Sequence, residues 1–490
     1  MHIISAQLAV GGIPAVTNWN ERYAMSKNAG PLTRSIAALQ SGKVTSTQLV
    51  SHSIESLEKY SDTLNVMAHK SYDDALQQAK MFDSGQATGA MLGAPALIKD
   101  LQNVKGMPTK KGSVAFKNAK PEAQDDATPA KLRASGFIFV GKSTLPEFGC
   151  NGYTANDLTG VTTNPWNTKL APGGSSGGSA AALSAGLVFA ATGTDGGGSI
   201  RTPAGYCGLL GLKPTNGMIG RWPAQDWIDY STDGILANSA DDLQIIYNIL
   251  KTPTAGDPAS LPLDAVNFLD NKQYSVGKIY AAERTSPFGK LPSETAKKFK
   301  ESVEAFGKLM KREVIWIEPR DVFPEGNPDL EWFNAVSADQ YTKFGKQWVE
   351  KNWDKLTKSG KDFLTIGKGV DLQEYMDLRR KRFTYIKNLD DLLDGDGLLL
   401  TPTNPSPGFA ADGSYNPPAK DYNESMQNVT GVPAISIPFG TCSNGLPFGL
   451  QVTALHFQDN RLINIASKFQ KAYPWKQLAP GYDGFEELIS

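Results

Sequence analysis

Two clusters of glycine and serine are the part of this chain best suited to covalent chemistry. The first, Gly173–Gly178, contains Ser175 and Ser176, and the second, Gly193–Gly198, leads directly into Ser199. Glycine tolerates positive φ, so several backbone N–H groups can turn toward one point and cradle an anion or oxyanion. A serine hydroxyl at the edge of such a cradle indicates acyl chemistry, in which the hydroxyl attacks a carbonyl carbon.

Other interpretations of the first cluster fit less well. A flexible linker is disfavoured because apolar segments flank the cluster inside a continuous α/β pattern. A phosphate-binding loop would need GxxxxGK[ST], which is absent. Residues 173–177 do match GxSxG, the nucleophile elbow of α/β-hydrolases, but no strand leads into them. Of the four histidines only His456 follows the serines, so a Ser-His-Asp arrangement is the weaker alternative.

A lysine can activate a serine without histidine if burial disfavours its charged form. Lys99 is the candidate, because the apolar run from Gly93 to Ile98 predicts a buried strand that leads into it. Asp100 ends that run. We therefore expect an amine with an unusual environment at the end of this strand.

Three separated motifs resemble the amidase signature family and occur in that family's order: GAPALIKD at 93–100, APGGSSGGSAAA at 171–182 and GTDGGGSIRTPAGYCGLLGLKPT at 193–215. The 24 positions from Ser175 to Ser199 also suit the family's pattern. Residues 396–408 and 428–452 resemble the family's closing strands. The resemblance covers the N-terminal half and the C-terminal fifth of the chain and fades in the middle.

The resemblance implies a Ser-cisSer-Lys mechanism in an enzyme of the urethanase-like or aryl-acylamidase-like kind. Ser199 would be the nucleophile, Ser175 would follow a cis peptide bond and relay protons, and Lys99 would be the terminal base. The oxyanion hole would consist of four backbone N–H groups, those of Gly196, Gly197, Gly198 and Ser199. No metal or organic cofactor is implied.

Three further residues are predicted to support this site. Asp195 and Arg201 flank Ser199, and we expect them to form a buried pair that holds the loop in shape. Ser176 is expected to hydrogen-bond near Lys99. Gly196 departs from the family, which usually carries a side chain there, so we expect a looser loop or a wider cavity.

Residues 145–163 are polar and loop-like, and in the family this region lies beside the nucleophile. The residues predicted to line the substrate pocket are Gly149, Cys150, Asn151, Thr154 and Trp227.

The pattern of elements predicts an α/β fold with the amidase signature architecture: a mixed, mostly parallel sheet with helices on both faces. We expect an N-terminal helical segment over 1–90, helical from Leu32 to about Ser84, and a signature core over 91–250. Residues 251–390 should hold an α/β unit and a helical substrate cover, with the aromatic-rich cover at 325–390. Residues 391–490 should complete the core sheet. The run 379–382 (RRKR) is predicted to be a solvated helix face.

Composition excludes several classes of protein. A net charge of −1 over 490 residues gives no electrostatic basis for binding nucleic acid or an anionic membrane. The sequence has no apolar stretch long enough to span a membrane, and its N-terminus lacks the basic region of a signal peptide. Three widely spaced cysteines fit neither a disulfide framework nor a CxxC metal site. We expect a cytoplasmic protein, either a monomer or a homodimer.

The combined prediction is a serine hydrolase that cleaves amide bonds of small or aryl substrates through an acyl-enzyme on Ser199. Carbamate (urethane) or ester hydrolysis at the same site is an alternative, because one oxyanion hole suits all three carbonyl types. Two other classes stay open: an amidase-like component of a tRNA-dependent amidotransferase, and a catalytically silent binding protein on the same fold.

Overall fold

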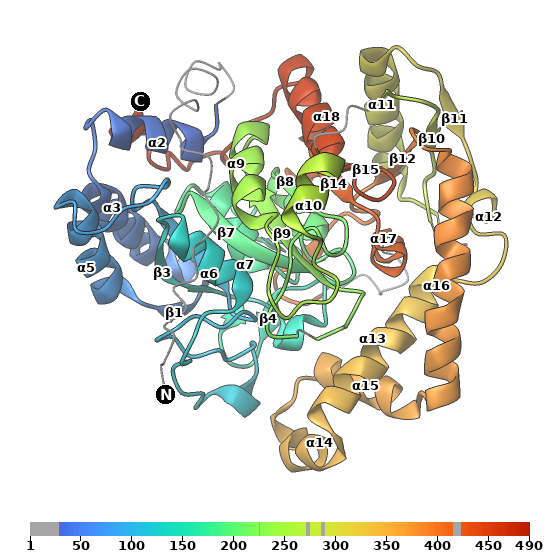
Figure 1. The fold of residues 1–490 in the computed structure, drawn as a ribbon, viewed down its shortest axis with the longest axis horizontal. Helices are drawn as coiled ribbons and strands as arrows, with labels where there is room; N and C mark the ends of the chain where they lie inside the picture. Colours follow the sequence, from blue (N-terminus) through green and yellow to red (C-terminus); the bar gives the residue numbers. More distant parts are fainter. Residues whose placement is uncertain (1–28, 225, 271–274, 286–289, 415–422) are drawn as a thin grey trace, which may run out of the picture.

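The structure is a computed structural model that describes residues 29–490 except 225, 271–274, 286–289 and 415–422. Residues 1–28 of the predicted N-terminal segment thus lie outside the described residues. An eleven-stranded sheet occupies the centre of the molecule (Figure 1). In sheet order its strands are β1 (Met67–Lys70), β3 (Ile138–Ser143), β2 (Pro95–Lys99), β7 (Ala190–Asp195), β9 (Thr232–Ala237), β8 (Leu210–Lys213), β14 (Ala434–Thr441), β15 (Pro447–Thr453), β12 (Leu398–Pro402), β10 (Ile279–Ala281) and β11 (Val314–Trp316).

The helices alternate with these strands through most of the chain. In chain order they are α2 (Pro31–Gln40), α3 (Ser46–Lys59), α4 (Ser61–Leu64), α5 (Tyr72–Asp83), α6 (Ala127–Ala134), α7 (Gly177–Ser184), α8 (Arg201–Cys207), α9 (Ala240–Leu250), α10 (Leu263–Asp270), α11 (Ser293–Met310), α12 (Pro319–Val322), α13 (Pro328–Phe344), α14 (Lys346–Asn352), α15 (Lys358–Gly369), α16 (Leu372–Leu393), α17 (Ser425–Thr430), α18 (Asp459–Ala472) and α19 (Glu486–Ile489). Short 3₁₀ turns lie at Val114–Phe116, Glu147–Gly149 and Trp353–Lys355. Two small ribbons pair β4 (Ala155–Asn156) with β5 (Gly160–Val161), and β6 (Leu170–Ala171) with β13 (Phe409–Ala410).

The predicted α/β fold with a mixed sheet is confirmed, but parallel pairing does not predominate. Both ends of the sheet are built from parallel pairs, β3 with β2 and β7 at one end, and β12 with β10 and β11 at the other. The central strands from β7 through β9, β8, β14 and β15 to β12 pair antiparallel. The sequence rhythm of strand, helix, strand fails there, because β14 and β15 are joined by a tight turn rather than by a helix.

Helices cover both faces of the sheet, as the sequence predicts. Along β2, Ala96 and Ile98 belong to the apolar core beneath α2, α9 and α18, whereas Leu97 packs on the opposite side with α3, α5 and α7. This alternation follows from the two-residue period of a strand. Lys99 therefore shares the face of Leu97, the face on which α7 lies.

Helices α13 to α16 form the predicted cover, which lies to one side of the sheet in Figure 1. Its core is aromatic and includes Phe363 and Tyr385. The same apolar cluster contains Trp227 and Tyr230 from the loop after β8, and Met426 from α17. The cover is thus packed directly onto the segments that surround the two glycine clusters.

Two sequence expectations are corrected. The stretch from Leu32 to Ser84 is not wholly helical, because β1 pairs antiparallel with β3 at the edge of the sheet. The RRKR run is not a solvated face as a whole: Arg379 and Arg382 lie one helical turn apart, and both bind Asp229 or its carbonyl. Arg382 also lies 4.5 Å above the ring of Tyr230. Arg380 alone fits the prediction well, with a largely exposed side chain.

Candidate active site

Lys99 ends the buried strand β2, and its side chain is fully buried. Its Nζ lies 2.7 Å from Ser175 Oγ, 2.9 Å from Ser176 Oγ and 2.8 Å from Thr194 Oγ1. A neutral amine has one lone pair and two hydrogens, so it can accept one hydrogen bond and donate two. Three hydroxyl partners match that capacity, and the predicted contact between Ser176 and Lys99 is present.

The environment of the amine favours its neutral form. Burial lowers the pKa of Lys99 to about 7, and the more distant carboxylates of Asp195 and Asp233 oppose the shift without reversing it. A base with a pKa near neutrality has a substantial uncharged fraction at physiological pH. The structure therefore gives Lys99 the property that proton abstraction from serine requires.

The first glycine cluster holds Ser175 and Ser176 at the start of α7. The Gly174–Ser175 peptide bond is cis, as the family resemblance implies. A Cβ at Gly177 would clash with Thr154, and one at Gly178 with Thr144, so the backbone approaches its neighbours closely at both glycines.

The second cluster forms the turn between β7 and α8, and here the predicted pair is confirmed. Arg201 Nη2 lies 2.9 Å from Asp195 Oδ1, and both side chains are fully buried. Although burial acts in the opposite direction, the Arg201 guanidinium holds the pKa of Asp195 well below its usual range. We refer to residues 195–199 as the oxyanion loop.

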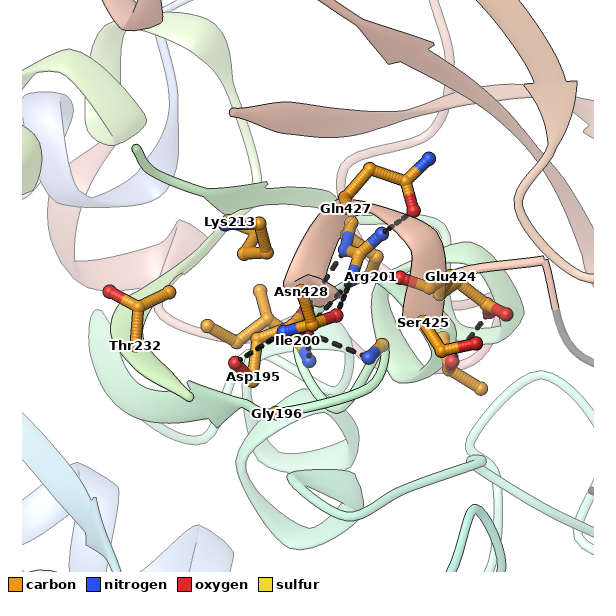
Figure 2. Close-up of polar contacts among 12 residues, drawn as sticks. Asp195, Gly196, Ile200, Arg201, Lys213, Thr232, Glu424, Ser425, Gln427 and Asn428 are labelled. Atoms are coloured by element: carbon orange, nitrogen blue, oxygen red, sulfur yellow. Dashed lines mark hydrogen bonds and ion pairs between the residues drawn. The ribbon is translucent and has the colours of Figure 1, made fainter. Parts of the chain in front are cut away.

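Arg201 also ties the oxyanion loop to the C-terminal part of the chain. Figure 2 shows its guanidinium between Asp195 and the side chains of α17. It donates to Gln427 Oε1 at 2.9 Å, to Asn428 Oδ1 at 2.7 Å and to the carbonyl of Glu424 at 2.8 Å. Every N–H direction of this buried cation is used, which offsets the cost of removing it from water.

One of the four predicted oxyanion donors is already engaged. The N–H of Gly198 donates to Asp195 Oδ1 at 2.7 Å. In this geometry it helps to shape the loop, so the assignment of Gly198 as an oxyanion donor is withdrawn. The amides of Gly196, Gly197 and Ser199 stay as the predicted donors.

Both predicted serines of the relay, Ser175 and Ser199, line one cavity. The backbone also holds the two segments together, since Ser176 N donates to Ser199 O at 3.2 Å. The cavity is lined by Leu101, Phe148, Gly149, Ser175, Thr194, Gly196, Ser199, Arg221, Asp226, Trp227, Ser231 and Asp233.

Of the five predicted pocket residues, Gly149 and Trp227 line this cavity and three do not. Thr154 donates to the carbonyl of Gly173 at 2.7 Å and supports the first glycine cluster. Asn151 donates to Ser359 Oγ at 3.2 Å and so contacts the cover. The Cys150 side chain packs into the apolar clusters beneath the cover. These side chains build the walls from behind because the 3₁₀ turn over 147–149 directs only its glycine toward Ser175.

Two tryptophans pack on the glycines of the oxyanion loop. A Cβ at Gly196 would overlap the ring of Trp227, and a Cβ at Gly197 would overlap the ring of Trp332 on α13. Trp332 Nε1 also donates to the carbonyl of Gly196 at 2.5 Å. The expectation that Gly196 loosens the loop or widens the cavity is therefore wrong, because an indole ring occupies the space.

Sequence reasoning missed several residues of the site. Thr194 lies one position before Asp195, and its hydroxyl contacts Lys99. Arg221 and Asp233 follow the second motif and line the cavity, while Trp332 comes from the cover. Three consecutive glycines where relatives carry a side chain was the available signal, since that pattern indicates a large neighbouring group.

The described residues offer neither a metal-binding cluster nor a membrane span. No group of three or more His, Cys, Asp or Glu side chains is arranged to hold a metal ion there. Within the same residues, no helix is long and apolar enough to cross a membrane.

Comparison with known proteins gives consistent matches over nearly the whole chain. A family model described as Amidase matches residues 48–463. The amidase-type component of the glutamyl-tRNA(Gln) amidotransferase of Synechococcus sp. (strain CC9605) is 31% identical over 469 residues, covering 89% of this chain and 94% of that protein. A bacterial aryl acylamidase of the amidase signature family superposes with a TM-score of 0.80 at 24% identity, over 93% of this chain and 97% of the other. A 6-aminohexanoate cyclic dimer hydrolase gives 0.79 at 22% identity, over 94% and 99%.

Proposed function

This chain belongs to the amidase family and is a hydrolase of carbon–nitrogen bonds other than peptide bonds; from that premise we propose that it cleaves amides of small or aryl substrates through an acyl-enzyme on Ser199. The observation that carries the proposal is the buried amine of Lys99 beside Ser175, in a wall of the cavity that also contains Ser199. That arrangement supplies a base, a relay and a nucleophile without histidine.

In the acylation step, neutral Lys99 accepts the proton of Ser175 as Ser175 accepts the proton of Ser199. The Ser199 oxygen then forms a bond with the substrate's carbonyl carbon, and the carbonyl electrons move onto oxygen. The amides of Gly196, Gly197 and Ser199 donate to this oxyanion. Each donor in a preorganised hole is typically worth about 100-fold or more in rate.

Collapse of this intermediate breaks the carbon–nitrogen bond. The leaving nitrogen takes a proton from Ser175, and protonated Lys99 restores the Ser175 hydroxyl. Water then attacks the Ser199 ester by the same relay, which releases the carboxylic acid and regenerates the serine. No atom in this cycle has to come from a cofactor.

Carbamate and ester hydrolysis are the first alternatives, since the same oxyanion loop suits those carbonyls. The aromatic residues that surround the cavity, Phe148 and Trp227, favour an apolar or aryl group on the substrate. A purified-protein assay on a matched anilide, aryl ester and N-aryl carbamate would rank the three. Turnover of none of them would contradict the proposal.

A second candidate function has a specific observation in its favour. The curated relatives are named as components of a glutamyl-tRNA(Gln) amidotransferase, with about 30% identity over most of both chains. We propose that this chain acts without such partners, because its net charge of −1 offers no electrostatic basis for binding tRNA. Hydrolysis of free amides by a single species in size-exclusion chromatography would support independence, and activity only with added partners would contradict it. The monomeric or homodimeric state and the cytoplasmic location stay predictions.

Labelling with a serine-reactive fluorophosphonate tests the nucleophile directly. We expect mass spectrometry to find one adduct, on Ser199, and we expect Lys99→Ala to abolish it at neutral pH. Labelling of Ser199→Ala at another serine would show that a different residue is the nucleophile.

A further inference from the structure

Two opposite charges that the proposed mechanism does not use line the cavity beside Ser199. They are Arg221, in the loop after β8, and Asp233, on β9. Asp233 is 2% exposed. Its Oδ2 accepts a hydrogen bond from Gln102 Nε2 at 2.7 Å, which fixes the orientation of the carboxylate.

The remaining polar atoms of this pair are unsatisfied. Among the described residues, Asp233 Oδ1 and Arg221 Nη1 are buried and have no hydrogen-bond partner. The two groups attract one another electrostatically, but no nitrogen–oxygen contact within 4.0 Å joins them in that part of the chain. Buried polar atoms without partners are uncommon and costly in native proteins, so each calls for an explanation.

The chemistry of the missing partner follows from the signs of the two groups. A carboxylate would pair with Arg221 but would be repelled by Asp233, and by Asp226 on the same cavity wall. An ammonium group would pair with Asp233 but would face the guanidinium. A neutral group with both a carbonyl oxygen and an N–H can satisfy both at once. Primary carboxamides and ureas have that combination.

We propose that Arg221 and Asp233 form a subsite for a second amide-type group on the substrate, with Arg221 donating to its carbonyl and Asp233 accepting from its N–H. The proposal rests on the proposed amide hydrolysis and specifies its substrate class as diamides and related ureido amides. The reacting amide lies at Ser199, and the second amide lies against the charged pair.

Matched substrates of equal length test this subsite. The diamides malonamide, succinamide, glutaramide and adipamide are each compared with the monoamide in which methyl replaces one carboxamide. For the diamide that spans the distance, we expect kcat/KM to exceed that of its monoamide by about 10- to 100-fold, because sites built to hydrogen-bond a group reject analogues that lack it. The corresponding monoamide acid and amino amide should be poorer than the diamide.

The variants Arg221→Met and Asp233→Asn distinguish a subsite from a structural role. If the pair binds the second amide, each substitution lowers the diamide-to-monoamide ratio toward one. If the pair only supports the fold, both substrates lose activity together and the ratio is unchanged, which would overturn the proposal. Arg380→Met, at an exposed arginine on α16, is the matched control and should leave the ratio and both rates as they are.

Binding to Ser199→Ala separates this proposal from the proposed function. Calorimetric titration with the preferred diamide should detect binding that the added substitution Arg221→Met abolishes, whether or not the enzyme turns the diamide over. Monoamide hydrolysis without any diamide preference would overturn the subsite and leave the function standing. Binding without any hydrolysis would leave the subsite and contradict the function, and neither binding nor hydrolysis would overturn both.

Discussion

At the scale of single residues, the site depends on how one amine is kept from water. Lys99 is fully buried among three hydroxyls, and burial brings its pKa to about 7. Only the uncharged amine can accept a proton from Ser175. The activity of the enzyme should therefore depend on pH through this group.

We expect kcat/KM for an uncharged amide to rise about tenfold per pH unit below pH 7 and to level off above it, because protonation of Lys99 removes the base. Initial rates from pH 5 to 9 would measure this, with tryptophan fluorescence as the control that the protein stays folded. A rate that is constant through pH 7 would contradict the role of Lys99.

Arg201 is the second residue on which the site depends. Its replacement by methionine leaves the buried Asp195 without its counter-ion, and losing one partner of a buried pair typically costs about 3–5 kcal/mol. We expect Arg201→Met to lose that much free energy of unfolding in urea and to lose most of its kcat. Lys387→Met, in an exposed ion pair, is the control and should change stability little. Full activity in Arg201→Met would show that the oxyanion loop does not need the guanidinium.

The sequence predicts the chemistry-bearing residues well because they lie within short motifs. Lys99, Ser175 and Ser199 each stand in a contiguous run whose local composition fixes their surroundings. Arg221 and Asp233 have no such local signal, since what sets them apart is the absence of a partner among the described residues of the folded chain. Such an absence can be seen only after the chain is folded.

At the scale of elements, the cover and the oxyanion loop form one structural unit. Helix α13 brings Trp332 against Gly197, and its indole N–H donates to the carbonyl of Gly196. Trp227 stands edge-on to Trp332, with ring centroids 6.1 Å apart. The helix that covers the site thus also holds the backbone that would meet the oxyanion.

Replacing Trp332 by phenylalanine should retain an aromatic ring and remove the hydrogen bond. We expect kcat to fall about 3- to 30-fold with a smaller change in KM, because a donor amide in the oxyanion loop would be less well oriented. Steady-state kinetics with an anilide would measure it. Trp353→Phe, on the outer side of the cover, is the matched control and should keep wild-type kcat. Equal effects of the two substitutions would contradict a positioning role for Trp332.

Sequence reasoning recovered the cover as a set of helices but not its contact with the loop. The helical period gave the elements between 328 and 393, whereas Trp332 looks like any other aromatic of the cover. More than a hundred residues separate it from Gly196. Pairing at that distance is decided by packing, which the pattern along one segment does not contain.

At the scale of the whole molecule, segments distant in sequence close the fold around the sheet. Asp242 on α9 accepts hydrogen bonds from the N–H and hydroxyl of Thr33, at 2.9 and 2.7 Å, and so caps the start of α2. Arg34 on α2 in turn binds Glu486 on α19. The first and last described helices are thereby attached to the same side of the core.

The pH dependence of stability should report the Asp242 contact. Burial raises the pKa of Asp242 to about 6, above its value of about 4 in an unfolded chain. The folded state therefore binds this proton more tightly, so the stabilisation is complete below about pH 4 and is lost as the pH rises through 6. Relative to Asp242→Asn, which does not titrate, the wild type should lose on the order of 2–3 kcal/mol between pH 4 and 7.

Urea denaturation of both proteins at several pH values would measure this difference. Asp264→Asn, at an exposed position on α10, is the control and should run parallel to the wild type. Parallel curves for the wild type and Asp242→Asn would contradict the raised pKa of Asp242.

The docking of Trp332 on two glycines has a consequence for evolution and for engineering. A lineage that alters its cover to admit new molecules also disturbs the backbone that would perform catalysis, so specificity and rate are inherited together. A chimaera that grafts the cover of a relative onto this core would have to restore the lost contact, either by retaining an indole at that position or by exchanging the glycine run as well.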